Sequence, residues 1–248
     1  DLASILKTCA YNNFTIPFEH TIHIAMQVCS GLHHAHSKTD ESGTNLGIIH
    51  RDVSPHNVLV SYDGEVKVID FGVAKASVKL TNTMSGIIKG KLLYMAPEQA
   101  MAKPLDPRAD LFAVGLVLYK MTTGRLPFEG ENEFQVYNKL VAGKVMSPRK
   151  VNPAIPEGLD RVMVKVLSKK PSGRQSDAMA VRNDLSAVLQ GLDPGYTASR
   201  LARFMETYFP PPPINTGESE AVAATQGAGQ DGSQTQPDTP APSLSLGA

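Results

Sequence analysis

The feature that most constrains this chain is an Asp and an Asn placed five residues apart, directly before a β-rich run. They stand in the segment His50-Arg51-Asp52-Val53-Ser54-Pro55-His56-Asn57. Two runs of β-forming residues, 58–60 and 65–69, follow, and the Asp63-Gly64 pair between them favours a hairpin. The second run ends at Asp70-Phe71-Gly72. Because a hairpin returns the chain to its starting edge, we expect the Asn and the later Asp to lie close together.

The residue types in this pattern indicate a metal and phosphate site. Asn57 and Asp70 carry the hard oxygen atoms that Mg²⁺ prefers. Asp52 could accept or orient the proton of an attacking hydroxyl group.

Further motifs follow in a fixed order. Tyr94-Met95-Ala96-Pro97-Glu98 closes a segment that begins at Asp70. Together, these motifs resemble those of the protein kinase family, with a catalytic loop at 50–57 and an activation segment at 70–98. Residues 110–115 resemble the start of that family's buried central helix, and residues 123–128 the turn after it. The Val-Ser-Pro variant of the catalytic loop looks most like bacterial members.

The resemblance implies a protein kinase-like fold of the α+β class, seen here as a mainly helical carboxy-terminal lobe with a small β-hairpin. It implies transfer of the γ-phosphate of ATP, with Mg²⁺, to a Ser or Thr hydroxyl of a protein substrate. Asp52 would then be the base, and Asn57 and Asp70 would bind the metal and nucleotide. Arg51 would read a phosphate on Thr83 or Ser85.

The resemblance also assigns a set of structural residues. Arg174 occupies the place of the arginine that pairs with the Ala-Pro-Glu glutamate, here Glu98. The full structural set that we expect is His50, Arg51, Phe71, Gly72, Glu98, Asp110 and Arg174.

The residues before His50 depart from the family pattern. They contain neither a glycine-rich loop nor a strand lysine, and Lys7 has no strand context. Since the chain also begins at Asp1 rather than Met, we expect a fragment without the amino-terminal lobe that covers ATP. Such a fragment would bind ATP only if that lobe were present and would be inactive alone. A non-catalytic, pseudokinase-like binding module is the alternative.

Two positions near the catalytic Asp also depart from the pattern. Ser54 stands where these kinases usually have a lysine that contacts the transferred phosphate, and Lys91 stands where they usually have a threonine. In the family these side chains lie close together. One hypothesis is a swap that keeps one ammonium group at the site; the other is that Lys91 points to solvent and Ser54 weakens catalysis.

Apolar periodicity predicts the remaining organisation. A helix should begin at Pro17 and end near Ser37, and residues 110–122 should form a helix that is buried on all sides. We assign 1–192 to the kinase lobe and 193–209 to an extra amphipathic helix. The Pro, Gly, Ser and Gln-rich residues 210–248 are predicted to be disordered.

Composition narrows the partners and the cellular location that we expect for this chain. The formal net charge is zero, which gives no reason to expect nucleic-acid binding. No apolar run is long enough to span a membrane. Cys9 and Cys29 lie in apolar surroundings, which favours buried thiols in a reducing compartment and a cytoplasmic location.

Two other site readings are weaker. His33 and His36 would share a helix face, but no Cys or acid completes a metal-binding set, and His36 is expected to pack at the helix end. A small-molecule phosphotransferase also has an Asp and an Asn at similar spacing. The Ala-Pro-Glu motif, the apolar central helix and Arg174 argue against that class.

Overall fold

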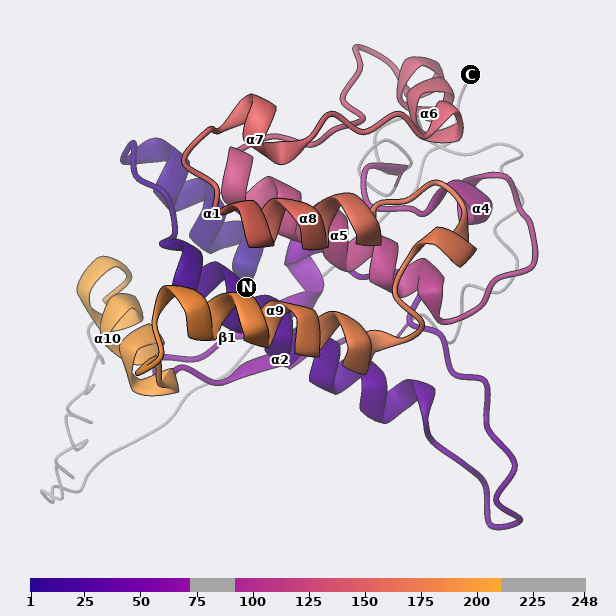
Figure 1. Cartoon of the computed structure of the whole chain (residues 1–248), viewed down its shortest axis with the longest axis horizontal. Coiled ribbons are helices and arrows are strands. Elements are labelled where there is room, and N and C mark those ends of the chain that lie inside the picture. Colours follow the sequence, from indigo (N-terminus) through magenta and orange to yellow (C-terminus); the bar gives the residue numbers. More distant parts are fainter. Residues whose placement is uncertain (72–91, 211–248) are drawn as a thin grey trace, which may run out of the picture. The chain divides into compact units, whose positions relative to one another are not determined.

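The computed structural model describes residues 1–71 and 92–210 of the 248-residue chain. Predictions that concern Gly72, Thr83, Ser85, Lys91 and the tail from 211 onward lie outside these residues. The described part is mainly helical with one two-stranded sheet, as the sequence predicted (Figure 1). Its elements are α1 (Leu2–Tyr11), α2 (Phe18–His36), η1 (Pro55–Asn57), β1 (Val58–Val60), β2 (Val66–Val68), α4 (Pro97–Ala100), α5 (Arg108–Thr123), α6 (Glu133–Ala142), α7 (Pro148–Val151), α8 (Glu157–Val166), η2 (Pro171–Gly173), α9 (Ala178–Leu192) and α10 (Ala198–Tyr208).

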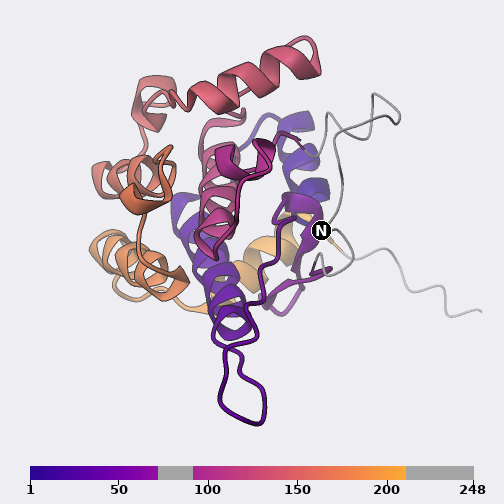
Figure 2. The ribbon, with the colours of Figure 1, turned by 90° about the vertical axis from the view of Figure 1, so that its right-hand side faces the viewer.

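Helix α2 begins and ends where its apolar spacing predicted. Pro17 is its amino-terminal cap and Ser37 its carboxy-terminal cap. The helix packs against α9, α5 and β2, so it lies in the middle of the described fold. After it, the loop through residues 38–47 extends away from the helices (Figure 2) and is closed by an isolated bridge between Thr39 and Asn45.

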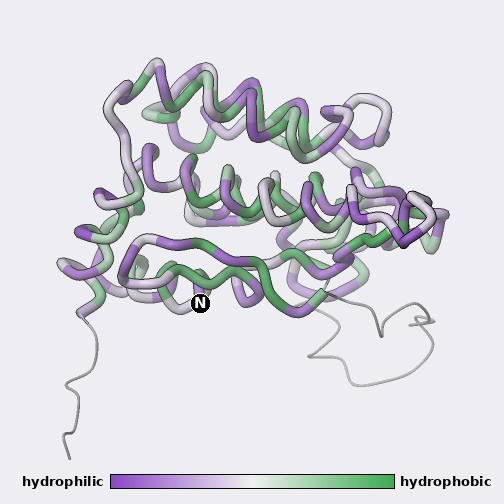
Figure 3. Tube along the Cα trace, turned by 90° about the horizontal axis from the view of Figure 1, so that it is seen from below, coloured by the Kyte–Doolittle hydropathy of each residue, from purple (hydrophilic) through white to green (hydrophobic). Residues whose placement is uncertain are grey.

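Helix α5 is buried along nearly its whole length, as expected from apolar residues on every face. A Cβ atom on Gly115 would lie 2.6 Å from Val166 Cγ1 and 2.9 Å from two side-chain atoms of Leu167, so only glycine allows this close approach between α5 and the end of α8. The helix ends at Gly124, which adopts the left-handed conformation with φ of 74°. Figure 3 shows hydrophobic residues recurring along the helical turns.

The hairpin pairs β1 and β2 antiparallel, with Val58 opposite Val68 and Val60 opposite Val66. The turn includes Gly64, whose φ is 80°. A Cβ atom there would lie 2.4 Å from the carbonyl oxygen of Ala198, so the turn lies directly against the start of α10. The second strand is shorter than predicted, because it covers 66–68 and not 65–69.

Helices α4, α6 and α7 were not predicted from the apolar periodicity. Helices α4 and α7 have four residues each, too short to show a 3.6-residue pattern. Helix α6 buries only Val136 and Leu140, and its Phe134 is 72% exposed, so its apolar face is narrow.

Both cysteines are buried free thiols, as predicted. Burial raises the pKa of Cys9 to about 11 and that of Cys29 to about 12, so both are protonated at neutral pH.

Candidate active site

The backbone at the start of the catalytic loop is held by the carboxylate of Asp110, in the first turn of α5. Oδ2 accepts from the backbone N–H of His50 at 2.8 Å, and Oδ1 accepts from that of Arg51 at 2.8 Å. Asp110 is 1% exposed, so these charge-assisted hydrogen bonds lie away from water. The buried helix α5 thus fixes the loop segment that precedes Asp52.

Arg51 has an unusual backbone conformation. Its φ is 65°, in the left-handed region that a long side chain rarely adopts, at a cost of about 1–3 kcal/mol. Two hydrogen bonds hold it there: its N–H donates to Asp110, and its carbonyl accepts from Gln99 Nε2 at 2.7 Å. Gln99 belongs to α4, so the segment after Ala-Pro-Glu is tied to the catalytic loop.

His50 connects this loop to the end of the hairpin. Its ring is fully buried, and Nε2 lies 2.9 Å from the carbonyl oxygen of Ile69. Its Nδ1 accepts from the N–H of Asp52 at 3.3 Å, which assigns the ring proton to Nε2. The ring of Phe71 lies 4.5 Å from that of His50, centroid to centroid. One imidazole therefore joins the segments that carry Asp52 and Asp70.

The hairpin brings Asn57 next to the segment before Asp70. The N–H of Ile69 donates to the carbonyl oxygen of Asn57 at 3.0 Å, and Asn57 Nδ2 donates to the carbonyl oxygen of Asp52 at 2.7 Å. Asp70 is exposed, and its φ of 59° is one that Asp tolerates better than most residues. The three side chains predicted to carry the chemistry thus come from directly linked segments.

These side chains suit Mg²⁺. The nitrogen of the Asn57 amide is engaged with Asp52, so the oxygen is the atom it could offer a cation, and Asp70 adds an exposed carboxylate. Among the residues that the structure describes, no cluster of three or more His, Cys, Asp or Glu could hold a metal. Mg²⁺ needs no such cage, since it usually keeps waters and phosphate oxygens as ligands beside one or two carboxylates.

Glu98 and Arg174 form a buried ion pair. Nη1 and Nη2 of Arg174 donate to the two carboxylate oxygens of Glu98 at 2.6 and 2.8 Å. The remaining donors reach three carbonyl oxygens, those of Ser168, Lys169 and Arg108, at 2.9–3.1 Å. Every N–H of this guanidinium is therefore paired, which buried charges require.

The same guanidinium lies over the ring of Phe112, with Cζ 4.7 Å from the centroid. Because Arg108 and Phe112 are both in α5, Arg174 links the Ala-Pro-Glu segment to the first turns of that helix. The sequence predicted the pairing of Glu98 with Arg174 but gave no sign that Arg174 also contacts α5.

His36 does more than pack at the end of its helix, because it contacts the carboxylate that holds the catalytic loop. Its Nε2 lies 2.7 Å from Asp110 Oδ2, so it supports the carboxylate that holds the catalytic loop. Its Nδ1 is buried and has no hydrogen-bond partner in the described structure. Sequence reasoning missed this contact because the two residues are far apart in the chain. A histidine at the end of a helix gives no signal of such a partner.

Ser54 lies at the cap position before η1, with its backbone extended and its carbonyl oxygen accepting from Asn57 at 3.0 Å. Its hydroxyl group makes no side-chain capping bond to η1. Arg51 Nε is buried and has no hydrogen-bond partner in the described part of the chain. The partners proposed for these two residues, Lys91 and a phosphate on Thr83 or Ser85, fall outside the described residues.

The protein kinase domain family matches residues 1–185. The chain is 39% identical over 209 residues, 84% of its length, to the tyrosine-protein kinase MasK of Myxococcus xanthus. It is 40% identical over 176 residues to the serine/threonine-protein kinase Pkn1 of Myxococcus xanthus, and 32% over 164 residues to PrkC of Bacillus subtilis. These matches cover 68% and 66% of the chain.

The matched regions span 32%, 24% and 24% of those relatives, so the chain covers a third of their length or less. None of the described helices is long and apolar enough to cross a membrane. The family match extends over most of the chain, and the loop, hairpin and buried ion pair lie within it. The chain belongs to the protein kinase family.

Proposed function

We propose that this chain is the catalytic and substrate-binding lobe of a serine/threonine protein kinase, which transfers the γ-phosphate of ATP to a protein hydroxyl. The observation that carries the proposal is the joining of Asp52, Asn57 and Asp70 through His50 and the hairpin. Two of them offer oxygen atoms suited to a cation, and the third lies in a loop whose backbone is fixed.

In this proposal Asp52 orients the acceptor hydroxyl and takes its proton. Asn57 and Asp70 would hold Mg²⁺, which supplies charge stabilisation at the phosphate oxygens. The chain's own contribution is position, since the buried Asp110 and His50 fix the segments that present these groups. Glu98 with Arg174 would anchor the end of the activation segment.

The acceptor residue needs its own test because one relative is named a tyrosine kinase and others serine/threonine kinases. The longest natural form of the protein that contains this chain should be incubated with labelled ATP and a mixed protein substrate. Phosphoamino-acid analysis should give phosphoserine or phosphothreonine. Phosphotyrosine alone would reject the serine/threonine assignment.

Ser54 and Lys91 allow a sharper test of the mechanism. If Lys91 supplies the ammonium group that a lysine at position 54 would provide, Lys91→Thr should reduce turnover at least ~10-fold, which is about 1.4 kcal/mol of barrier. Adding Ser54→Lys should restore much of the loss. A double variant no better than the single one would reject the swap and favour weakened catalysis.

Turnover distinguishes an active kinase from the alternative, a non-catalytic binding module. Nucleotide binding without transfer to any hydroxyl, in the longest natural form, would favour the pseudokinase-like reading. Arg51 supports the catalytic one, because its buried Nε has no partner among the described residues and could receive a phosphate. Mass spectrometry of active protein should then find phosphate on Thr83 or Ser85.

A further inference from the structure

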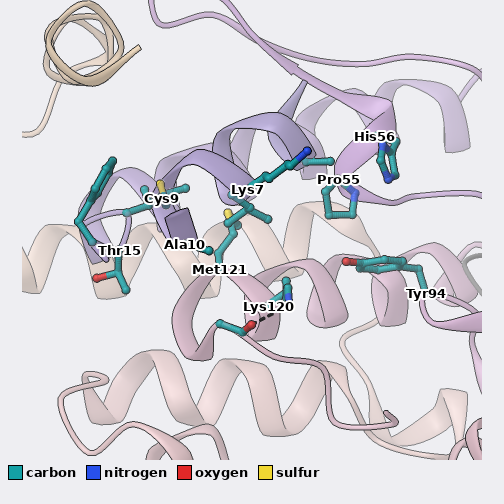
Figure 4. A pocket seen from close by; sticks show the side chains of 14 residues that line it. Lys7, Cys9, Ala10, Thr15, Pro55, His56, Tyr94, Lys120 and Met121 are labelled. Carbon is teal, nitrogen blue, oxygen red and sulfur yellow. Dashed lines mark hydrogen bonds between the residues drawn. The ribbon is translucent and has the colours of Figure 1, made fainter. Parts of the chain in front are cut away.

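A cavity of about 340 Å³ lies between α1, the catalytic loop and the last turn of α5 (Figure 4). Its floor is apolar and includes Leu6, Ile16 and Met121. Ile16 and Met121 belong to the hydrophobic core, so the floor is part of the fixed fold. A cavity of this size is at the small end of the range for ligand pockets and has room for one or two side chains of a bound peptide.

Three basic side chains line the cavity, each from a different element. Lys7 comes from α1, His56 from η1 and Lys120 from α5. Figure 4 shows Lys7 extending toward Pro55, with Tyr94 and Lys120 on the other side of the space. Lys120 is positioned by a hydrogen bond from Nζ to the carbonyl oxygen of Gly124 at 2.6 Å.

No acidic side chain is among the described residues that line this cavity. Two carboxylates lie near its edge: Asp1 Oδ2 is 3.9 Å from His56 Nδ1, and Glu129 is near enough to act on Tyr94. Asp1 is already engaged as the cap of α1 by Ser4, and Glu129 Oε1 accepts from Leu126 N–H. Both carboxylates keep their negative charge, but neither forms an ion pair with Lys7 or Lys120 in the described part of the chain.

The cavity adjoins the proposed active site. His56 lies in the same loop as Asp52, and Asn57 joins the two through its bond to the Asp52 carbonyl oxygen. Tyr94 lies just before α4, the helix that Gln99 ties to Arg51. A polypeptide that places a hydroxyl at Asp52 would pass the rim of this cavity with the residues next to that hydroxyl.

We propose that the cavity binds an acidic side chain of the protein substrate, close in sequence to the phosphorylated residue, with a neighbouring apolar side chain on the floor. Lys7 and Lys120 would donate charge-assisted hydrogen bonds to the carboxylate. Opposite charges on the two surfaces would also favour acidic over basic substrates. The position of the acceptor hydroxyl rests on the proposed function; the charge preference of the cavity does not.

The first test measures binding without catalysis. Two fluorescent peptides share one serine and one leucine and differ only in carrying three Glu or three Lys residues beside the serine. With the 248-residue chain at low salt, anisotropy should show at least ~10-fold tighter binding of the Glu peptide, about 1.4 kcal/mol. Salt should weaken that binding.

Variants locate the effect. Lys7→Glu with Lys120→Glu should remove the preference for the Glu peptide. Lys144→Glu with Lys150→Glu, two exposed lysines outside the cavity lining, changes the net charge by the same amount and should retain the preference. Equal affinity for both peptides, or an unchanged preference in the doubly reversed variant, would overturn the proposal.

The second test uses turnover in the longest natural form of the protein. The Glu peptide should have the higher kcat/KM, and reversal of both lysines should lower that value at least ~10-fold while the KM for ATP stays unchanged. Serine phosphorylation with no preference for Glu over Lys would reject the cavity proposal and leave the kinase proposal standing. Phosphorylation of neither peptide, with the binding preference intact, would count against the kinase function and support the cavity.

Discussion

The first and last turns of α5 both serve the region around the catalytic loop, but they hold charge in different ways. In the first turn, the Asp110 carboxylate is 1% exposed and accepts from two backbone N–H groups, with His36 as a third neighbour. In the last turn, Lys120 is half-buried and gives one hydrogen bond to Gly124. The Asp110 carboxylate has its hydrogen-bond partners within the fold, whereas the Lys120 ammonium group still has N–H donors that could bind a new partner.

The difference separates structural from binding roles. A buried charge whose partners are all protein groups fixes the backbone, and its loss leaves those partners unpaired at a high cost. A partly exposed charge contributes little to stability but can take a new partner without breaking the fold. We therefore expect changes at the two ends of α5 to separate into effects on stability and effects on substrate choice.

The largest effect on stability is expected for Arg174, which supports the first turns of α5. Arg174→Met would leave the buried Glu98 carboxylate without its ion pair and should lower the free energy of unfolding by about 3–5 kcal/mol. Urea denaturation followed by circular dichroism measures this change. A second change, Glu98→Leu, should recover part of the loss because it removes the unpaired charge; no recovery would contradict the explanation.

The next largest loss of stability is expected for Asp110→Ala. It leaves the N–H groups of His50 and Arg51 without their acceptor and should cost at least about 3 kcal/mol in unfolding free energy. Urea denaturation gives the value. Activity should fall with it, since Arg51 is held at a φ of 65° by this bond. A variant with native stability would show that the carboxylate does not hold the loop.

The smallest effect on stability is expected at the other end of the helix. Lys120→Ala removes one hydrogen bond to an exposed carbonyl oxygen and should change the unfolding free energy by less than about 1 kcal/mol. The same urea titration checks it. A loss as large as that of Asp110→Ala would remove the contrast between the two ends.

Much of this arrangement could be predicted from local sequence. The hairpin around Asp63-Gly64 and the buried helix α5 followed from turn residues and apolar spacing. The roles of Asp52, Asn57 and Asp70 came from motifs whose order resembles one family, and those roles stay predictions. The family itself is confirmed by the match over residues 1–185.

Other features depend on contacts between distant residues, which no local pattern records. His36 meets Asp110 only because α2 packs against α5. Lys7, His56 and Lys120 meet at one cavity only because α1 lies against the catalytic loop. Helix α6 was missed because its buried face is narrow.

The most direct test of the central claim is the Asp52→Asn variant of the longest natural form of the protein. The amide keeps the shape of the side chain but cannot accept the hydroxyl proton. We predict that phosphoryl transfer to protein falls at least ~100-fold while the unfolding transition in urea stays unchanged. Near-normal turnover in this variant would remove Asp52 from the mechanism and contradict the proposed active site.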